Sequence, residues 1–252
     1  MQPRHLEGIE WRPRREVDLG QWPYAVPAVR QLIDEGGLDI GPGVTILVGE
    51  NGSGKSTLIE AFATVYPRRG AESSSPIPVT GPSGSMEDSP LHWHLKARTH
   101  GLAAPGGFFL RAESFYNVAT EVDQLGTLDP YGGRSLHERS HGESFLALAV
   151  HRFGPRGLYL LDEPESALSV HGCLALLARM VDLVAEGSQF IVATHSPILL
   201  AYPVAAIWQI DADGTVRRVD YDDADPVRMH RDFLADPGRY LHHLLRDDDP
   251  PA

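Results

Sequence analysis

Short continuous apolar runs alternate along the chain with longer stretches in which apolar residues recur at helical spacing. Residues 44–49, 157–161 and 189–193 are apolar at nearly every position, which is typical of strands buried on both faces of a parallel sheet. Helical spacing predicts four main helices, at 27–35, 55–66, 143–153 and 170–185. Strands that alternate with helices in this way indicate an α/β fold with a mainly parallel sheet.

Weaker patterns add elements at the margins of this core. Further strands are expected at 14–18, 91–98 and 108–115, a hairpin at 207–221, and a last helix at 237–246. The hairpin surrounds Asp211-Ala212-Asp213-Gly214, a sequence typical of tight turns. The fold therefore includes a small antiparallel portion beside the parallel sheet.

The length and the distribution of turn residues predict one domain over residues 1–246. A chain of 252 residues lies at the upper end of what one hydrophobic core supports. Residues 68–107 are rich in Ser, Pro and Gly and predict a short insertion of helix and loops, and the acidic residues 247–252 predict a disordered tail.

Composition favours a globular protein of the cytoplasm. Hydrophobic residues make up 42% of the chain, yet no apolar run is long enough to cross a bilayer, so no direct membrane insertion is expected. The first residues are followed by no apolar stretch of signal-peptide length. Cys173 is the only cysteine, which excludes an intramolecular disulfide and the multi-cysteine zinc patterns.

The charge balance bears on nucleic acid as a partner. The net charge of −12 argues against a surface that wraps nucleic acid as a whole, but it leaves room for a local basic groove or one formed by a dimer. The basic clusters Arg12-Pro13-Arg14-Arg15 and Arg217-Arg218 are short and typical of solvated surface.

A phosphate-binding loop follows the first buried strand and precedes a helix. Its sequence is Gly49-Glu50-Asn51-Gly52-Ser53-Gly54-Lys55-Ser56-Thr57, which fits the pattern G-x-x-x-x-G-K-[ST]. Glycines let backbone N–H groups converge on phosphate oxygens at the positive end of the helix. We expect Lys55 to reach the β- and γ-phosphates, Ser56 to ligate Mg²⁺ and Thr57 to hold the α-phosphate. The alternative is a glycine-rich turn.

A pair of carboxylates ends the next buried strand, in Tyr159-Leu160-Leu161-Asp162-Glu163-Pro164. Asp162 is placed to orient the metal through its water shell, and Glu163 to polarise a water in line with the γ-phosphate as general base. The alternative is a solvated acidic turn.

Two further segments offer anion contacts whose interpretation depends on the rest of the site. Ser140-His141-Gly142-Glu143-Ser144 opens a helix, where a hydroxyl and a glycine form either an anion site or a helix cap. His195 ends the strand 189–193 at the carboxyl edge of the sheet, where it can contact a γ-phosphate or be structural.

Taken together, these segments resemble an ABC-type ATPase. Walker A is 49–57, the signature 140–143, Walker B 159–163, the D-loop 166–169 and the switch histidine His195, and their order matches the family over about 60% of the chain. The resemblance implies a signature subdomain at 108–156, ATP and Mg²⁺ as cofactors, and an ATP-dependent homodimer. In it, Ser140, Gly142 and Glu143 contact the nucleotide bound to the partner subunit, so that hydrolysis requires two copies.

Departures from the transporter pattern indicate a subgroup. The signature is Ser-His-Gly-Glu where transporter subunits usually have Ser-Gly-Gly-Gln, and the switch segment is Thr-His-Ser-Pro rather than Thr-His-Asp. Both resemble the soluble SMC, RecF and OLD-like ABC ATPases, a group with DNA-repair and phage-defence proteins, and small bacterial ATPases of AAA type. We expect action on a partner protein or on DNA or RNA. The alternatives are a transporter's nucleotide-binding subunit and an ATP-dependent switch with negligible turnover.

The sequence leaves three assignments undecided: the Q-loop residue, the adenine-stacking residue and the role of two histidines. The segment Phe109-Leu110-Arg111-Ala112-Glu113 lacks the glutamine of the family's Q-loop, so Glu113 is the candidate metal ligand, with Gln124 as the alternative. Tyr24 either stacks on the adenine or packs in the core. His92 and His94 would share one face of a strand, but the absence of a nearby carboxylate or cysteine disfavours a metal site.

Overall fold

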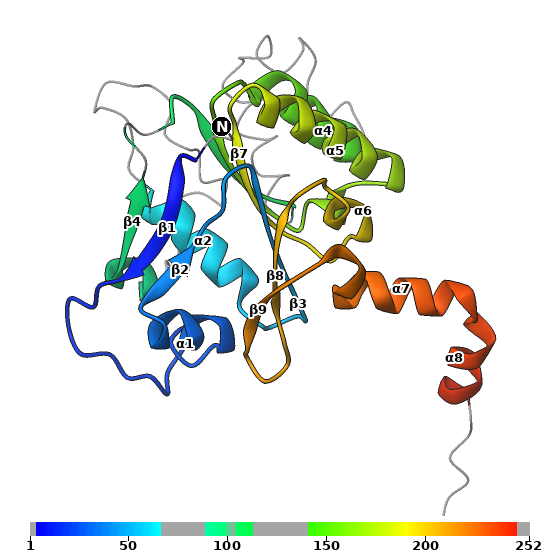
Figure 1. Cartoon of the computed structure of the whole chain (residues 1–252), viewed down its shortest axis with the longest axis horizontal. Coiled ribbons are helices and arrows are strands. Elements are labelled where there is room, and N and C mark those ends of the chain that lie inside the picture. Colours follow the sequence, from blue (N-terminus) through cyan, green and yellow to red (C-terminus); the bar gives the residue numbers. More distant parts are fainter. Residues whose placement is uncertain (1–3, 67–88, 100, 102–103, 113–140, 246–252) are drawn as a thin grey trace, which may run out of the picture.

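A computed structural model describes residues 4–66, 89–99, 101, 104–112 and 141–245 (Figure 1). The elements, in chain order, are β1 (Leu6–Trp11), α1 (Pro27–Asp34), β2 (Gly37–Asp39), β3 (Val44–Gly49), α2 (Lys55–Val65), the 3₁₀ helix η1 (Pro90–His94), β4 (Leu95–Thr99), β5 (Gly107–Arg111), α4 (His141–Arg152), β6 (Leu158–Asp162), the 3₁₀ helix η5 (Pro164–Ala167), α5 (Val170–Ala185), β7 (Gln189–Ala193), α6 (Pro197–Leu200), β8 (Ala206–Ile210), β9 (Val216–Val219), the 3₁₀ helix η6 (Tyr221–Asp223), α7 (Asp225–Ala235) and α8 (Pro237–Leu244).

The central sheet has six strands in the order β5-β6-β7-β3-β8-β9. Neighbouring strands are parallel from β5 to β8, and only the hairpin strand β9 runs antiparallel, on β8. A second sheet of three antiparallel strands, β2-β1-β4, lies beside it. The predicted fold class, a mainly parallel α/β sheet with a small antiparallel portion, is therefore confirmed.

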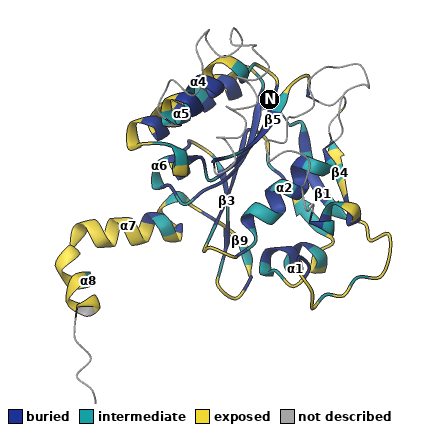
Figure 2. Ribbon diagram, turned by 180° about the vertical axis from the view of Figure 1, so that it is seen from behind, coloured by how far each residue is buried: buried dark blue, intermediate teal, exposed yellow. Residues whose placement is uncertain are grey.

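Two hydrophobic cores cover the two faces of the central sheet (Figure 2). Along β3, Val44, Ile46 and Val48 face the core shared with α4 and α5, whereas Leu47 faces the core shared with α1, α2 and the small sheet. Adjacent residues of a strand point to opposite faces, and both faces of β3 are covered. This explains why β3 is apolar along nearly its whole length.

The N-terminal strand is Leu6–Trp11, and the strand predicted at 14–18 is wrong. Leu6 and Ile9 are buried against α2, while the arginine-rich stretch after the strand is exposed. The buried amide of Gln189 fixes this strand, because its Oε1 accepts from the backbone N–H groups of His5 (2.7 Å) and Leu6 (2.8 Å). The alternation of apolar and polar residues within a segment cannot reveal a hydrogen-bond partner that is so far away along the chain.

The strand predicted at 91–98 begins only at Leu95. Residues 90–94 form the 3₁₀ helix η1, because Pro90 supplies a fixed φ at its start and the Ser89 hydroxyl accepts from the Leu91 N–H. His92 and His94 therefore do not share a strand face. His94 is buried, and its Nδ1 accepts from the Arg14 N–H at 3.1 Å.

Helix α7 was not predicted, and it lies outside the body of the molecule. We call α7 and α8 together the C-terminal arm, since both project away from the central sheet (Figures 1 and 2). Val227 is the buried member among the arm residues whose burial is described. Most of the insertion 68–107 and the tail 247–252 lie outside the described residues. None of the described helices has the length and apolar character needed to cross a bilayer.

Candidate active site

The phosphate-binding loop connects β3 to α2 at the carboxyl edge of the central sheet. Gly54, the residue before α2, has φ +104°, a conformation that side chains rarely adopt. A Cβ at this position would also overlap Cγ1 of Val26. The loop therefore requires glycine here for both its backbone conformation and its packing.

Lys55 is folded back onto the loop that carries it. Its ammonium donates to the carbonyl oxygens of Gly49 (2.7 Å) and Glu50 (2.9 Å), and the residue is 3% exposed. Burial lowers the pKa of Lys55, and the carboxylates of Glu163, Asp162 and Glu165 oppose that shift. The Ser53 hydroxyl in the same loop is buried and has no hydrogen-bond partner among the described residues.

A polar network joins the loop helix to the ends of β5 and β6. The Ser56 hydroxyl donates to Asp162 Oδ1 at 3.0 Å, and Arg111 Nε donates to Asp162 Oδ2 at 2.9 Å. Arg111 also donates to Glu60 Oε2 at 3.0 Å. Burial acts to lower the pKa of Arg111, but the two carboxylates outweigh it and raise that pKa.

Sequence reasoning missed Arg111. The residue ends the strand in which a Q-loop glutamine was sought, and the parallel register of β5 and β6 places it directly beside Asp162. A basic residue at the end of an apolar strand is the signal that could have found it, once β5 and β6 were known to be neighbours. Glu113 and Gln124 lie outside the described residues.

Glu163 and His195 face each other at the ends of β6 and β7. Glu163 has φ 48° and ψ 51°, the left-handed region, and its N–H donates to the Ala193 carbonyl at 2.9 Å. His195 Nε2 lies 3.6 Å from Glu163 Oε1, too far for a hydrogen bond. Glu165 Oε1 accepts from the His195 backbone N–H at 2.5 Å, while Glu165 Oε2 is buried without a partner in the described part of the chain.

Two neighbouring depressions open on these groups. The first, about 480 Å³, is lined by the loop residues 51–52 and 54–57, with Trp22, Val26 and Glu163. The second, about 570 Å³, is lined by Glu50, Asn51, Glu163, Glu165, Ser166 and His195. Since Asn51 and Glu163 line both, the two depressions form one continuous surface around the loop.

Tyr24 does not line this surface, and its position agrees with the second of the two roles considered for it, packing in the core. Its ring is buried, 7% exposed, and lies edge-on against Trp11 (6.2 Å between centroids) and His94 (5.9 Å). Trp22, two residues earlier, is 60% exposed and lines the first depression.

The described part of the signature segment lines neither depression. Gly142, in the first turn of α4, packs against the D-loop, where an added Cβ would stand 3.0 Å from the Ala167 carbonyl oxygen. Glu143 in the same turn is exposed. Ser140 lies outside the described residues. Neither Gly142 nor Glu143 lines the surface around the phosphate loop of its own chain.

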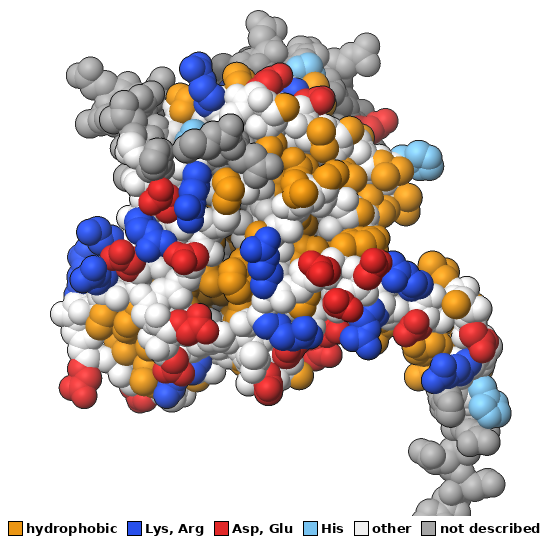
Figure 3. Space-filling view, in the orientation of Figure 1, with side chains coloured by type: hydrophobic (Ala, Val, Ile, Leu, Met, Phe, Trp, Pro, Cys, Tyr) orange, Lys and Arg blue, Asp and Glu red, His pale blue; other side chains and the backbone are white. Residues whose placement is uncertain are grey.

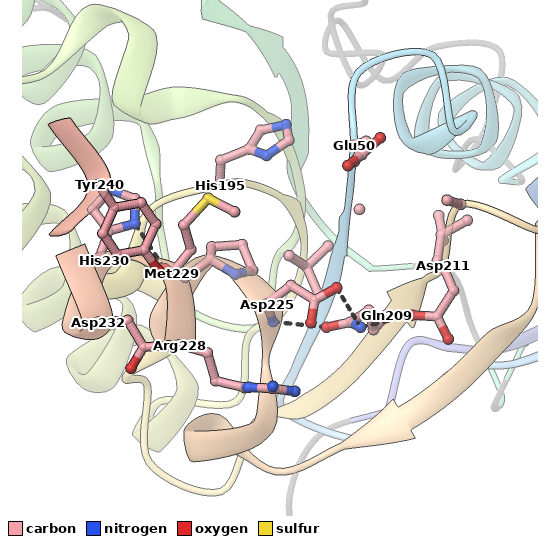
Figure 4. A pocket seen from close by; sticks show the side chains of 15 residues that line it. Glu50, His195, Gln209, Asp211, Asp225, Arg228, Met229, His230, Asp232 and Tyr240 are labelled. Carbon is pink, nitrogen blue, oxygen red and sulfur yellow. Dashed lines mark hydrogen bonds between the residues drawn. The ribbon is translucent and has the colours of Figure 1, made fainter. Parts of the chain in front are cut away.

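A third cavity, about 420 Å³, separates the phosphate loop from the C-terminal arm (Figure 4). Glu50 and His195 line it from the core, and Met229, His230 and Tyr240 line it from the arm. The buried Gln209 of β8 holds the base of the arm, because its amide donates to Asp225 Oδ2 (2.9 Å) and accepts from the Asp225 N–H (2.8 Å).

The segments that form this site are similar to known protein families and to known proteins. Residues 132–201 match a family described as "AAA domain, putative AbiEii toxin, Type IV TA system", and residues 28–66 match a family described as "AAA domain". The chain is 32% identical over 166 residues to the thiamine import ATP-binding protein ThiQ of Ruegeria sp. (strain TM1040), covering 60% of this chain and 70% of that protein.

More distant similarities extend over larger parts of the chain. The cytochrome c biogenesis ATP-binding export protein CcmA of Rhodopseudomonas palustris (strain HaA2) is 28% identical over 67% of this chain and 86% of its own length. The chain spans only 40% of a putative ribose/galactose/methyl galactoside import ATP-binding protein of Agrobacterium fabrum, at 27% identity. Among solved structures, the SMC head domain from Thermotoga maritima aligns with a TM-score of 0.39 and 17% identity, over 73% of this chain and 92% of that chain.

Proposed function

The chain belongs to the P-loop ATPases of the ABC type, and from this premise we propose that it hydrolyses MgATP at composite sites between two copies. The observation that carries the proposal is the convergence of Lys55, Ser56, Asp162, Glu163 and His195 on one edge of the sheet. We take residues 1–246 as the ATPase domain.

The residues of the loop fit a nucleotide and its metal. Gly54 leaves space that a side chain would fill, and the unpartnered Ser53 hydroxyl and the Lys55 ammonium are donors for phosphate oxygens. Lys55 exchanges its two carbonyl partners for the β- and γ-phosphates. Gly49, Asn51 and Gly52 shape the loop, and Thr57 contacts the α-phosphate.

The metal position is built from oxygen ligands, as Mg²⁺ prefers. Ser56 would hold the ion, and Asp162, already hydrogen-bonded to Ser56, would orient the water ligands of the ion. The ion would supply positive charge opposite the β- and γ-phosphates. Arg111 fixes the second oxygen of Asp162 and so holds the carboxylate in one orientation. It is a positioning residue.

Glu163 acts as the general base and His195 as the γ-phosphate contact. Glu163 takes the proton from a water that attacks in line with the γ-phosphate, and His195 donates to a γ-phosphate oxygen. Glu163 holds a left-handed backbone conformation, which is uncommon in non-glycine residues and occurs often at functional sites, as it would here beside His195.

The second copy completes each site through its signature segment. Ser140, Gly142 and Glu143 of one copy contact the γ-phosphate held by the phosphate loop of the other. The described members of this segment, Gly142 and Glu143, line neither depression of their own chain, which supports this arrangement. Trp22 replaces Tyr24 as the aromatic residue that stacks on the adenine.

The test is ATP turnover of the wild type and of Glu163→Gln. Loss of the base lowers turnover about 10²- to 10⁴-fold while ATP still binds. The matched control is Glu16→Gln, an exposed carboxylate in the loop after β1, which leaves turnover unchanged. Equal rates for the wild type and Glu163→Gln, or no turnover by the wild type under any condition, overturn the catalytic assignment.

The ATP cycle acts, in this proposal, on a partner protein or on nucleic acid in the cytoplasm. The Ser-His-Gly-Glu signature and the match to a family described with a putative toxin support a repair- or defence-like role. A pull-down with Glu163→Gln trapped by ATP identifies the partner. Recovery of only the bait in repeated trials counts against a stable partner.

A second candidate is the nucleotide-binding subunit of a membrane transporter. The similarity to an import ATP-binding protein favours it, whereas the signature and the missing Q-loop glutamine oppose it. Co-purification of the chain with an integral membrane protein supports this candidate over the first.

A further inference from the structure

The C-terminal arm exposes apolar side chains along both of its helices. Within the described part of the arm, the large apolar residues and their exposed fractions are Met229 (65%), Phe233 (40%), Leu234 (73%), Leu241 (45%) and Leu244 (75%). Leu245 follows directly and is 75% exposed. Taking roughly 170 Å² for a whole large side chain, these residues together expose roughly 600 Å² of apolar surface.

The arm is a preformed structure rather than a loose extension. The rings of Phe233 and Tyr240 meet edge to face at 5.7 Å, which fixes α8 against α7. Asp236 caps α8 by accepting from the Arg239 N–H at 3.1 Å, and Gln209 holds Asp225 at the base. The exposed apolar residues are therefore presented in a fixed arrangement.

A second uncovered apolar face lies on α4 and α5 of the same chain, which we call the α5 face. Val170, Leu174 and Val181 are 62%, 50% and 43% exposed, and their spacing aligns them along one side of the helix. Val150 of α4 is 53% exposed. Hydrophobic side chains gather over these helices in the space-filling view (Figure 3).

The α5 face carries no charge along its middle. The exposed positions between His171 and Asp182 are Leu174, Ala175, Ala178 and Val181. Arg179 is turned inward, since its guanidinium donates to the Phe153 carbonyl at 2.7 Å. A solvated helix face normally bears charged residues, so this face is suited to an apolar partner.

The arm is neutral, which favours the α5 face over nucleic acid as its partner. Residues 225–244 contain three arginines and three aspartates, and the whole chain has a net charge of −12. A phosphate backbone requires a basic surface, whereas two apolar surfaces without net charge associate through burial alone. Each chain thus carries two uncovered surfaces of matching chemistry.

Their positions relative to the proposed composite site agree with a contact between copies. The arm borders the same cavity as Glu50 and His195, beside the phosphate loop. The α5 face begins at Val170, directly after the D-loop turn against which Gly142 packs. The arm therefore adjoins the phosphate loop, and the α5 face adjoins the signature, the two elements that the proposed composite site brings together from different copies.

We infer that the arm of one copy packs against the α5 face of a second copy and clamps the ATP-bound dimer. This inference rests on the proposed composite site. It adds to that site an apolar contact that neither the phosphate loop nor the signature provides.

The first test is cross-linking between two differently marked copies. One copy carries Leu241→Cys and the other Leu174→Cys, both with Glu163→Gln and with the buried native thiol removed by Cys173→Ala. With ATP and a short thiol-reactive cross-linker, the mixture yields a dimer that contains one copy of each. A product from the Leu241→Cys copy alone indicates an arm-to-arm contact and overturns the inference.

The second test is ATP-dependent dimerisation of arm variants, measured by sedimentation in the Glu163→Gln background. Leu234→Asp with Leu244→Asp weakens the dimer at least tenfold, and Leu174→Asp does the same from the other surface. The control, Trp93→Asp, places the same charge at a residue 49% exposed in η1, beside the small antiparallel sheet, and leaves dimerisation unchanged.

The experiments distinguish a failure of the composite site from a failure of the clamp alone. If the parent Glu163→Gln protein stays monomeric with ATP, the composite site itself is wrong, and the clamp with it. If the parent dimerises and the arm and α5-face variants dimerise equally well, the composite site stands and the clamp alone is overturned.

Discussion

The phosphate-loop edge, by which we mean the phosphate loop and the neighbouring ends of β5, β6 and β7, lies on one side of a cavity, and the C-terminal arm lies on the other. Charged side chains are paired in the first region, whereas large apolar side chains are exposed in the second. At the edge, charged groups from separate elements are paired, as Arg111 is with Asp162 and Glu60. On the arm, large apolar groups such as Leu234 face solvent, and Val227 alone among the arm residues of described burial is buried. The edge pairs the charges of Arg111, Asp162 and Glu60 within one chain, whereas the arm leaves large apolar groups exposed.

The difference teaches where each region obtains its stability. Burying a polar group costs free energy unless the group is paired. The edge is therefore stable only when the loop and the strand ends keep the hydrogen-bonded positions of their polar side chains. The exposed apolar residues of the arm make few contacts inside their own chain, because they are already in water. Substitutions at the edge therefore affect the site strongly, whereas substitutions of these exposed arm residues leave the stability of the isolated chain nearly unchanged.

Gly54→Ala has the largest expected effect on the phosphate-loop edge. Its Cβ would overlap Val26 in a backbone conformation that disfavours side chains, so the loop shifts and ATP affinity falls at least about 100-fold. Calorimetric titration with ATP measures the loss. Gly36→Ala is the matched control, because Gly36 also has a positive φ but has no atoms within 4 Å of the added Cβ. Equal affinity for Gly54→Ala and the wild type would show that the loop does not hold the phosphates.

Arg111→Met breaks the network while leaving the loop intact. Asp162 then loses one of its two fixed partners, and residues that orient metal ligands typically contribute 10- to 100-fold to activity, so we expect turnover to fall by about that factor. Mg²⁺ titration of ATP turnover detects the change as a higher metal requirement. Arg111→Lys keeps the charge but not the forked geometry and restores only part of the activity. An unchanged Mg²⁺ dependence in Arg111→Met contradicts the positioning role.

Trp22→Ala tests whether Trp22 belongs to the ATP site and not to the hydrophobic core. Loss of a stacking ring on an exposed loop lowers ATP affinity about 2- to 12-fold and leaves the free energy of unfolding nearly unchanged. Tyr24→Leu does the reverse, because its ring packs against Trp11 and His94; it costs about 1–2 kcal/mol of stability and leaves affinity unchanged. Fluorescent-nucleotide binding and urea unfolding separate the two. The opposite assignment of effects would restore Tyr24 as the stacking residue.

The elements predicted well from sequence are those with local determinants. Strand β7 and helix α5 have the predicted bounds, because continuous apolar runs and helical spacing are visible within the segment itself. The strand at Leu6–Trp11 escaped prediction because it depends on the Gln189 amide, far away in the sequence. Helix α7 escaped because its large apolar residues other than Val227 are exposed and do not line a core of the same chain.

The candidate site divides in the same way. The loop and the Asp162-Glu163 pair stand in contiguous motifs, so their types and spacing predict their chemistry. Arg111 could not be assigned, because its contact with Asp162 depends on β5 lying beside β6. Whether Trp22 or Tyr24 faces the site depends on Trp11 and His94, which pack one ring and leave the other exposed.

The smallest expected effect is on the arm itself. Leu234→Ala changes the free energy of unfolding of the isolated chain by less than about 0.5 kcal/mol, because the side chain is 73% exposed and loses few contacts. Val227→Ala, in the same helix but 3% exposed, costs roughly 1–3 kcal/mol. Urea unfolding without nucleotide, at concentrations where the chain is monomeric, measures both. A large loss in Leu234→Ala would mean that the arm tip already packs against its own chain, and the contrast between edge and arm would disappear.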